Sequence, residues 1–189
     1  MKLADLLFRI RSFTPIPFIA VALYWAQVRP AFIIIGLLLA ILGELLRINS
    51  VRYAGGATRT RNVGASSLVT SGPYARVRNP LYVANMMIYT GFALASGTLF
   101  PYLPVVAFMY FYFQYYMIVK LEEKTLGELF GTEYTEYRRG VPGLFPKFIS
   151  VNVGGKPNLR LTEALYNERS TLIGFTLVWL LLAVRLMVF

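Results

Sequence analysis

The chain has 189 residues, 57% of them hydrophobic and only 15% charged, with a net charge of +10. Soluble domains usually carry about 25% charged residues, so this composition predicts an integral membrane protein. Cysteine and histidine are absent, which excludes disulfides, thiolate metal sites and histidine acid–base chemistry; no metal site is predicted. We attribute the basic charge to the flanks of membrane spans, facing the bilayer surface, and expect no nucleic-acid partner.

The apolar segments predict an all-α integral membrane protein with about five transmembrane helices. Residues 1–12 are interpreted as an interfacial helix or a basic flank, and not as a cleavable signal peptide, because Pro15 and Pro17 interrupt the next apolar run. The expected spans cover residues 13–28, 31–46, 81–97, 102–119 and 171–189. We treat residues 1–189 as a single membrane domain in which residues 170–189 form the C-terminal transmembrane helix.

An acidic residue, Glu44, ends the apolar run of the second span, and Arg47 comes three residues later. One interpretation is an ion pair between these two side chains near the interface. The other is a carboxylate turned into the bundle towards a ligand. The sequence leaves both open.

Basic residues are concentrated in three segments, with three in residues 1–12, six in 47–79 and eight in 120–169. The positive-inside rule then predicts that all three segments are cytoplasmic and that the C-terminus lies on the opposite side. Segment 47–79 also contains Gly55, Gly56 and Gly64, so we expect a surface segment with a flexible turn. Segment 120–169 is expected to be helical to about residue 130 and then broken by Pro142, Pro146 and the glycines at 154–155.

Residues 68–82 interrupt the apolar pattern with two prolines and two arginines. Pro73 and Pro80 lack a backbone N–H and disfavour helix at the preceding residue, so one regular helix is not expected here. Arg76 and Arg78 would be costly in hydrocarbon. The stretch should therefore lie at a membrane surface or line a polar cavity, where irregular backbone can be satisfied and ligands are held.

Residues 72–82, GPYARVRNPLY, resemble the G-x-Y-x-x-x-R-H-P-x-Y signature of the isoprenylcysteine carboxyl methyltransferases. These enzymes belong to a broader family of integral-membrane methyltransferases that includes the phospholipid methyltransferases. A second block, with Glu122, Glu123, Leu126 and an F-G-x-x-Y-x-x-Y run over 130–137, is similar to the family pattern E-E-x-x-L-x-x-x-F-G-x-x-Y-x-x-Y. The resemblance covers residues 60–148, which we take as a methyltransferase-like core containing both blocks.

The resemblance implies S-adenosyl-L-methionine as cofactor, a non-Rossmann pocket at the cytoplasmic side, and a lipid or lipidated small molecule as substrate. The chain indeed lacks a G-x-G-x-x-G fingerprint. By resemblance, the cofactor-binding positions are Ser67, Leu68, Val69, Tyr74, Asn79, Pro80, Leu81, Tyr82 and Glu122. The expected catalytic residues are Arg78, Glu122 and Glu123: a glutamate pairs with the cofactor's amino group, and the arginine grips a carboxylate in a fork.

Two positions depart from the prenylcysteine enzymes. Asn79 stands where they carry histidine, and Ile118 stands where they carry an arginine that resembles a clamp for the substrate carboxylate. Loss of that clamp argues against a prenylcysteine substrate. It leaves open a phospholipid amine, which must be deprotonated before it attacks.

The sequence also admits two alternatives. One is an NADPH-dependent membrane reductase of the sterol-reductase type, and the other is a non-catalytic lipid-binding membrane protein. The sequence does not distinguish O-, N- or S-methylation, and it leaves the acceptor, the oligomeric state and the role of the last span open.

Overall fold

The structure of the chain is a computed structural model that describes residues 3–55, 67–147 and 155–188. These residues form helices and connecting segments, with no strand among them. In chain order the helices are α1 (Leu3–Ile10), α2 (Pro15–Tyr24), α3 (Pro30–Ala54), the 3₁₀ helix η2 (Gly72–Ala75), α4 (Pro80–Ala95), α5 (Tyr102–Gly140) and α6 (Leu161–Val188). The all-helical architecture predicted from the sequence is confirmed for this part of the chain.

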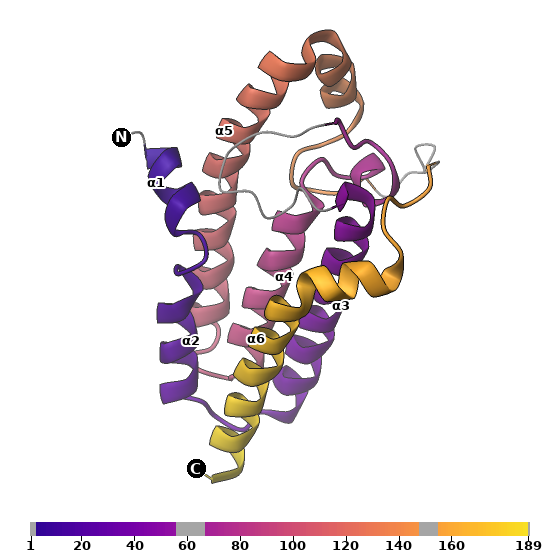
Figure 1. The fold of residues 1–189 in the computed structure, drawn as a ribbon. Coiled ribbons are helices and arrows are strands. Elements are labelled where there is room, and N and C mark those ends of the chain that lie inside the picture. Colours follow the sequence, from indigo (N-terminus) through magenta and orange to yellow (C-terminus); the bar gives the residue numbers. More distant parts are fainter. Residues whose placement is uncertain (1–2, 56–66, 148–154, 189) are drawn as a thin grey trace.

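The longer helices form a bundle, with α1 beginning at one end and α6 finishing at the other (Figure 1). The last turns of α5 extend beyond the other helices at the end where α1 lies, and η2 lies at that same end. The first turns of α6 run across the bundle before the helix descends along it. Both motif blocks therefore lie at one end of the molecule.

Three helices, α3, α5 and α6, are long and apolar enough to cross a membrane. The α1–α2 pair also qualifies when it is counted as one span that is bent by 56°. Helix α4 is apolar but has only 16 residues, fewer than the roughly 20 that a span usually needs. The described residues thus contain three or four candidate spans and indicate an integral membrane protein, while the count of five stays a prediction.

Several helix boundaries differ from the predicted ones because hydropathy alone does not end a helix. The sequence predicts a first span over 13–28, whereas α2 covers only Pro15–Tyr24, begins with Pro15 and Pro17 in its first turn, and ends four residues earlier than predicted. Helix α3 continues past its apolar run and ends only where Gly55 adopts a φ of 72°. Helix α6 likewise begins ten residues before its predicted span.

The predicted helix over 119–130 is confirmed as part of α5, which continues to Gly140 across a non-helical Gly131. Segment 47–79 is not all surface loop, because its first residues belong to α3. Gly56 and Gly64, for which a flexible turn was predicted, lie outside the described residues. So does Gly154, which was predicted to break the segment 120–169.

Helices α3 and α4 pack in close backbone contact, and they do so at small residues. A Cβ placed on Gly36 would lie 2.4 Å from the carbonyl oxygen of Gly91, and one on Gly43 would lie 2.8 Å from the carbonyl oxygen of Ala84. Small side chains allow membrane helices to approach this closely. Glu44, which follows Gly43 directly, is buried beside this seam.

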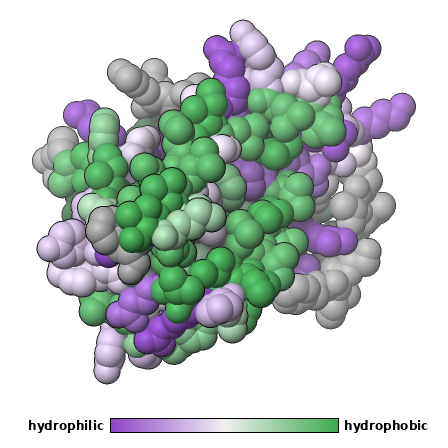
Figure 2. Space-filling view, turned by 90° about the horizontal axis from the view of Figure 1, so that it is seen from below, coloured by the Kyte–Doolittle hydropathy of each residue, from purple (hydrophilic) through white to green (hydrophobic). Residues whose placement is uncertain are grey.

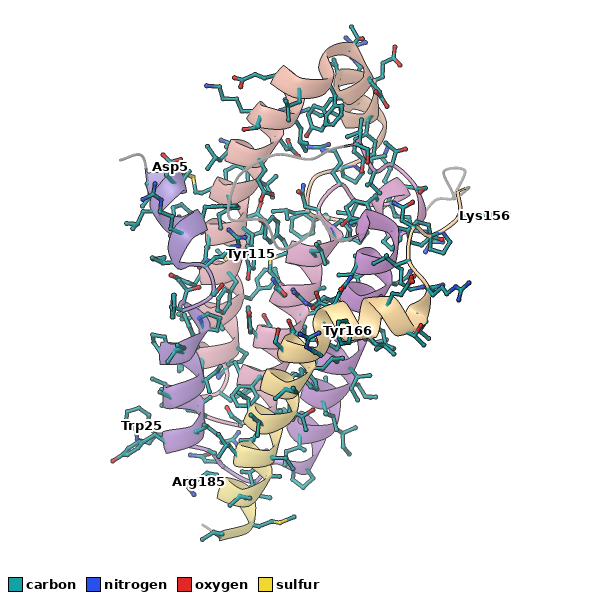
Figure 3. The ribbon with its side chains drawn as sticks, viewed as in Figure 1. Asp5, Trp25, Tyr115, Lys156, Tyr166 and Arg185 are labelled. Atoms are coloured by element: carbon teal, nitrogen blue, oxygen red, sulfur yellow. The ribbon has the colours of Figure 1, made fainter. Side chains whose placement is uncertain are left out.

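The surface of the bundle suits a hydrocarbon surrounding. Large hydrophobic side chains along the helices, among them Leu38, Leu42 and Leu181, are more than half exposed, and hydrophobic side chains also cover much of the end face shown in Figure 2. Trp25, which is exposed, and Arg185 lie towards the end where α6 finishes, whereas Asp5 and Lys156 lie towards the opposite end (Figure 3). Aromatic and basic side chains at the ends of apolar helices are typical of membrane interfaces.

Candidate functional site

The Gly-Pro turn of the first block has a local cause. Gly72 adopts a φ of 61°, and a Cβ on it would lie 2.5 Å from the ring of Tyr53 on α3. Glycine alone meets both requirements, since it accepts a left-handed conformation and lets the ring cover the backbone. The hydroxyl of Tyr137 on α5 donates to the Tyr74 carbonyl oxygen at 2.7 Å, which ties η2 to the second block.

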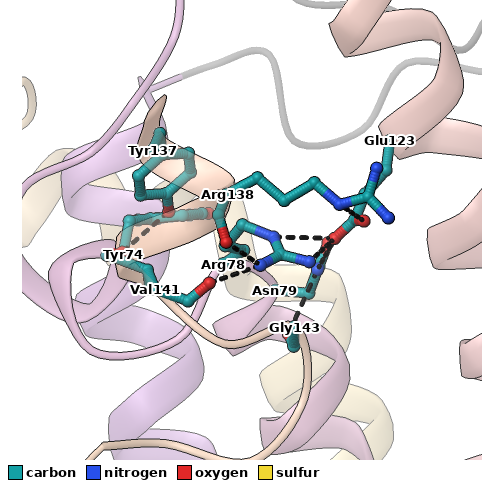
Figure 4. A network of polar contacts seen from close by, with 8 residues as sticks. All are labelled: Tyr74, Arg78, Asn79, Glu123, Tyr137, Arg138, Val141 and Gly143. Carbon is teal, nitrogen blue, oxygen red and sulfur yellow. Dashed lines mark hydrogen bonds and ion pairs between the residues drawn. The ribbon is translucent and has the colours of Figure 1, made fainter. Parts of the chain in front are cut away.

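Arg78 is the centre of the contact between the two blocks (Figure 4). Its Nε and Nη2 donate to one carboxylate oxygen of Glu123 at 2.8 and 2.7 Å. Its Nη1 donates to the carbonyl oxygens of Arg138 and Val141. The carboxylate that Arg78 grips in this structure is therefore one from its own chain, and the side chains of both partners are almost fully buried.

Backbone hydrogen bonds extend this contact. The N–H groups of Arg78 and Asn79 donate to the carbonyl oxygens of Pro142 and Gly143 at 2.8 and 3.2 Å. The Asn79 side-chain amide also donates to the Gly143 carbonyl oxygen at 3.1 Å. The segment directly after α5 thus satisfies the irregular backbone of the first block, as irregular backbone beside a membrane requires.

The two blocks border a cavity of about 840 Å³. All nine positions that the resemblance assigns to the cofactor line it: Ser67, Leu68, Val69, Tyr74, Asn79, Pro80, Leu81, Tyr82 and Glu122. Arg78 lines it as well, whereas Glu123 is not among the described residues that do. Of the two adjacent glutamates, Glu122 lines the cavity, whereas Glu123 forms a hydrogen-bonded ion pair with Arg78.

The Glu122 carboxylate is held in place by an aromatic pair. The Tyr82 hydroxyl donates to Glu122 at 2.7 Å, and the Tyr82 ring stacks on the buried ring of Tyr115 at a centroid distance of 4.7 Å. Nearby, burial raises the pKa of the Tyr74 phenol, and the charge of Glu122 adds to this shift while that of Arg47 opposes it. Tyr74 therefore stays neutral at physiological pH and offers a hydrogen bond and a ring face.

A second polar group lines the cavity between α3, α4 and α6. The Arg47 guanidinium donates to Glu168 at 2.7 Å and to Asn85 at 2.6 Å. Glu44 is only 6% exposed, and its two carboxylate oxygens have no hydrogen-bond partner among the described residues. The structure therefore has no ion pair between Arg47 and Glu44. It agrees with the other interpretation, in which the Glu44 carboxylate is turned into the bundle.

Helix α6 forms a wall of the cavity, which gives the last span a role that the sequence left open. Its contribution is a mixture of small, hydroxyl and aromatic side chains: Ser170, Thr171, Gly174, Phe175, Val178 and Trp179. The ion pair between Arg47 and Glu168 attaches α6 to α3, and Trp179 meets Phe92 of α4 edge to face at 5.6 Å. The sequence analysis missed these residues because α6 carries no motif. The one available signal was an acidic residue, Glu168, shortly before the last apolar run, and the structure shows that it is buried.

The long apolar helices indicate an integral membrane protein, and a cavity lies between the helices of the bundle. The phospholipid methyltransferase family matches residues 31–133, more than half of the chain, and the chain belongs to that family. The family resemblance seen in the two blocks is thereby confirmed.

Two curated proteins are similar to this chain. The cobalt-zinc-cadmium resistance protein CzcN of Cupriavidus metallidurans is 32% identical over 120 residues, which cover 64% of this chain and 51% of that protein. The nickel-cobalt-cadmium resistance protein NccN of Alcaligenes xylosoxydans xylosoxydans is 27% identical over 117 residues, covering 62% and 51%. The chain thus spans about half the length of the curated relatives it matches.

Proposed function

We propose that this protein transfers a methyl group from S-adenosyl-L-methionine to an amphiphilic, lipid-like acceptor. Family membership implies methyl transfer. The observation that carries the finer proposal is the convergence of all nine predicted cofactor positions on one cavity.

The residues present suit this cofactor. The Glu122 carboxylate, oriented by Tyr82, would hold its amino group through a charge-assisted hydrogen bond. Tyr74 and Tyr82 would offer ring faces to the adenine or the sulfonium cation. When bound, S-adenosyl-L-methionine supplies an electrophilic methyl group on sulfur. The chain contributes orientation and exclusion of water, which account for much of the acceleration of such displacements.

Arg78 and Glu123 act in this proposal mainly by positioning. Because the Arg78 guanidinium already holds Glu123 and two carbonyl groups, a ligand carboxylate would have to share it. The network keeps the first block against the end of α5 and so keeps Asn79 and Tyr82 at the cavity wall.

A lipid-like acceptor fits the size and lining of the cavity. Its volume of about 840 Å³ lies in the upper part of the range of about 300–1,000 Å³ found for small-molecule sites, which leaves room for a headgroup beside the cofactor. Apolar side chains from α2, α4 and α6 line another part of the cavity and would accept an acyl or prenyl chain: Phe18, Ile19, Phe92, Phe175, Val178 and Trp179. We further propose five spans, with α4 as one of them, and cytoplasmic motif blocks.

The names of the two relatives refer to resistance to cobalt, zinc, cadmium and nickel. This chain has neither histidine nor cysteine, the side chains that bind such ions most readily. We therefore propose methyl transfer, and not metal binding, as its activity.

The test is transfer of a radiolabelled methyl group from S-adenosyl-L-methionine to total lipid extract in proteoliposomes. We expect label in the lipid phase, and at least about tenfold less with Glu122→Gln, because the charged partner of the amino group is lost. Glu128→Gln, on an exposed ion pair of α5, is the matched control. Reduction of a sterol by NADPH with no methyl transfer would replace this proposal by the reductase, and lipid binding without either reaction would replace it by a lipid-binding protein.

A further inference from the structure

Glu44 is the buried group that the cofactor assignment does not use. It lies on α3 beside the close seam with α4 and lines the same cavity as Tyr82 and Glu122. Its side chain is almost fully buried, and neither carboxylate oxygen has a hydrogen-bond partner among the described residues. A carboxylate in this situation costs several kcal/mol if it stays charged and unpaired, so a chain that keeps one inside a membrane bundle has a use for it.

No salt bridge to Glu44 is found among the described residues, and Arg47 attracts it only at longer range. Arg47, one turn further along α3, directs its Nε to Glu168 and its Nη1 to Asn85. A buried carboxylate that lines a cavity and lacks a salt bridge among the described residues favours a ligand that brings one positive charge.

We propose that Glu44 binds the protonated amino group of the methyl acceptor and accepts its proton. This inference rests on the proposed function and deepens it by assigning the acceptor end of the cavity to α3. Asn85 and the hydroxyl side chains of Ser170 and Thr171, which line the cavity with Glu44, flank the acceptor headgroup.

The proton balance of this step is simple. An ammonium R–NH₃⁺ gives one proton to the Glu44 carboxylate, which leaves a neutral amine and a neutral carboxylic acid. The freed lone pair on nitrogen forms the new N–C bond as the C–S bond of the methyl donor breaks, with its electron pair remaining on sulfur. Glu44 therefore acts as a base before methyl transfer, a task that the Asn79 amide cannot perform and for which the chain offers no histidine.

The test separates charge recognition from cofactor binding. The probe is an alkyltrimethylammonium amphiphile, which carries the positive charge but can be neither deprotonated nor methylated. Its inhibition constant is measured against methyl transfer to phosphatidylethanolamine, and its direct binding is measured by calorimetry in a nonionic detergent. Binding of S-adenosylhomocysteine is measured with the same samples of wild type, Glu44→Gln, Glu44→Asp and the control Glu128→Gln.

We expect Glu44→Gln to weaken binding of the quaternary amphiphile by about tenfold or more and to lower kcat/KM for phosphatidylethanolamine at least as much. We also expect it to leave S-adenosylhomocysteine binding unchanged and to melt at the same or a higher temperature, because an unpaired buried charge is removed. Glu44→Asp should retain part of the affinity, since the charge is kept.

Unchanged amphiphile binding and unchanged turnover in Glu44→Gln, with normal S-adenosylhomocysteine binding, would overturn this inference and leave the proposed function standing. A wild-type protein that binds no S-adenosylhomocysteine and transfers no methyl group would overturn both. A folding defect of Glu44→Gln would show as a lower melting temperature and would also contradict the inference, because it would make Glu44 a structural group.

Discussion

Arg78 and Glu123 come from the two motif blocks and are 45 positions apart in the sequence. Their side chains are 11% and 9% exposed, and one oxygen of Glu123 accepts two of the arginine's N–H groups. A pair this well buried and this well bonded is sensitive to the loss of either partner, because the remaining charge stays buried. The pair is the main side-chain link between the blocks.

We predict that Arg78→Leu lowers the free energy of unfolding by about 3 kcal/mol, towards the lower end of the cost of breaking a buried ion pair, because Glu123 keeps a 3.7 Å contact with the exposed side chain of Arg138. The measurement is thermal unfolding in detergent. Lys124→Gln is the control, since its pair with Glu128 is largely exposed and should contribute less than about 1 kcal/mol.

The double variant of Arg78→Leu with Glu123→Leu should lose less than the two single variants added together, because no unpaired charge is left behind. Additive losses would show that the two residues act separately, against the direct contact between their side chains.

At this scale the motif blocks predict one part of the cavity lining, but neither the residues of α6 nor the different contacts of the two adjacent glutamates. Glu122 and Glu123 are adjacent in a helix, where consecutive residues point about 100° apart, and only one can face the cavity. The motif names both. Which one faces the cavity depends on the position of Arg78, a contact across 45 residues that no local pattern encodes. Glu44 was ambiguous for the same reason, since its neighbour Arg47 is paired 121 positions away with Glu168.

Among the elements, α3 and α4 form the frame on which the site is built. Their close approach depends on glycines whose Cβ positions fall on backbone atoms: a Cβ at Gly91 would lie 2.5 Å from the Gly36 carbonyl oxygen and 2.9 Å from the Ala40 nitrogen. Backbone atoms in a packed helix cannot move aside as a flexible side chain can. Both helices also supply cavity residues, among them Glu44 and Tyr82.

We predict that Gly91→Ala destabilises the protein by about 1–3 kcal/mol through overpacking. Gly127→Ala in α5 is the matched control, because its nearest contact would be an ordinary 3.8 Å from the Tyr134 ring and alanine favours helix by about 0.5–1 kcal/mol over glycine. The melting temperatures of the two variants should therefore move in opposite directions. A Gly91→Ala variant as stable as wild type would mean that the two helices do not pack in backbone contact.

The apolar runs predicted where the long helices lie, but they did not predict how far these helices extend. Helices α3 and α6 both extend beyond their hydrophobic residues into polar sequence, because charged side chains such as Arg47 and Glu163 fit a helix as well as apolar ones do. The extra turns contain Arg47 and Glu168, and the ion pair between these two residues joins α6 to α3 beside the cavity.

For the whole molecule, the arrangement has a polar end and an apolar body. The cavity reaches η2 and the first block, at the end where α1 lies, and is lined by residues of α1 to α6. The sequence predicted that both blocks share one side of the membrane, and they do share one end of the bundle. It could not predict that α6 lines the cavity, because that depends on packing between distant segments.

We predict that the end carrying both blocks faces the cytoplasm. The chain has no cysteine, so a single introduced cysteine is the only thiol of this sequence that a maleimide can label. Glu128→Cys and Tyr102→Cys probe the two ends of α5 at side chains that are well exposed. A membrane-impermeant maleimide should label position 102 in intact cells and position 128 only in inverted vesicles. The reverse pattern, or labelling of both from one side, would reject this orientation.

The most direct test of the assigned activity is calorimetric titration of S-adenosylhomocysteine into the detergent-purified protein, with NADPH titrated in parallel. We expect saturable binding of S-adenosylhomocysteine that weakens by about tenfold or more in Glu122→Gln, where the carboxylate charge is lost, and that weakens in Tyr82→Phe, where the carboxylate loses its orienting hydroxyl. Glu128→Gln should bind as wild type does, and NADPH should not bind. Binding of NADPH in its place, or no saturable binding of either compound, would contradict the assignment of this cavity to a methyl donor.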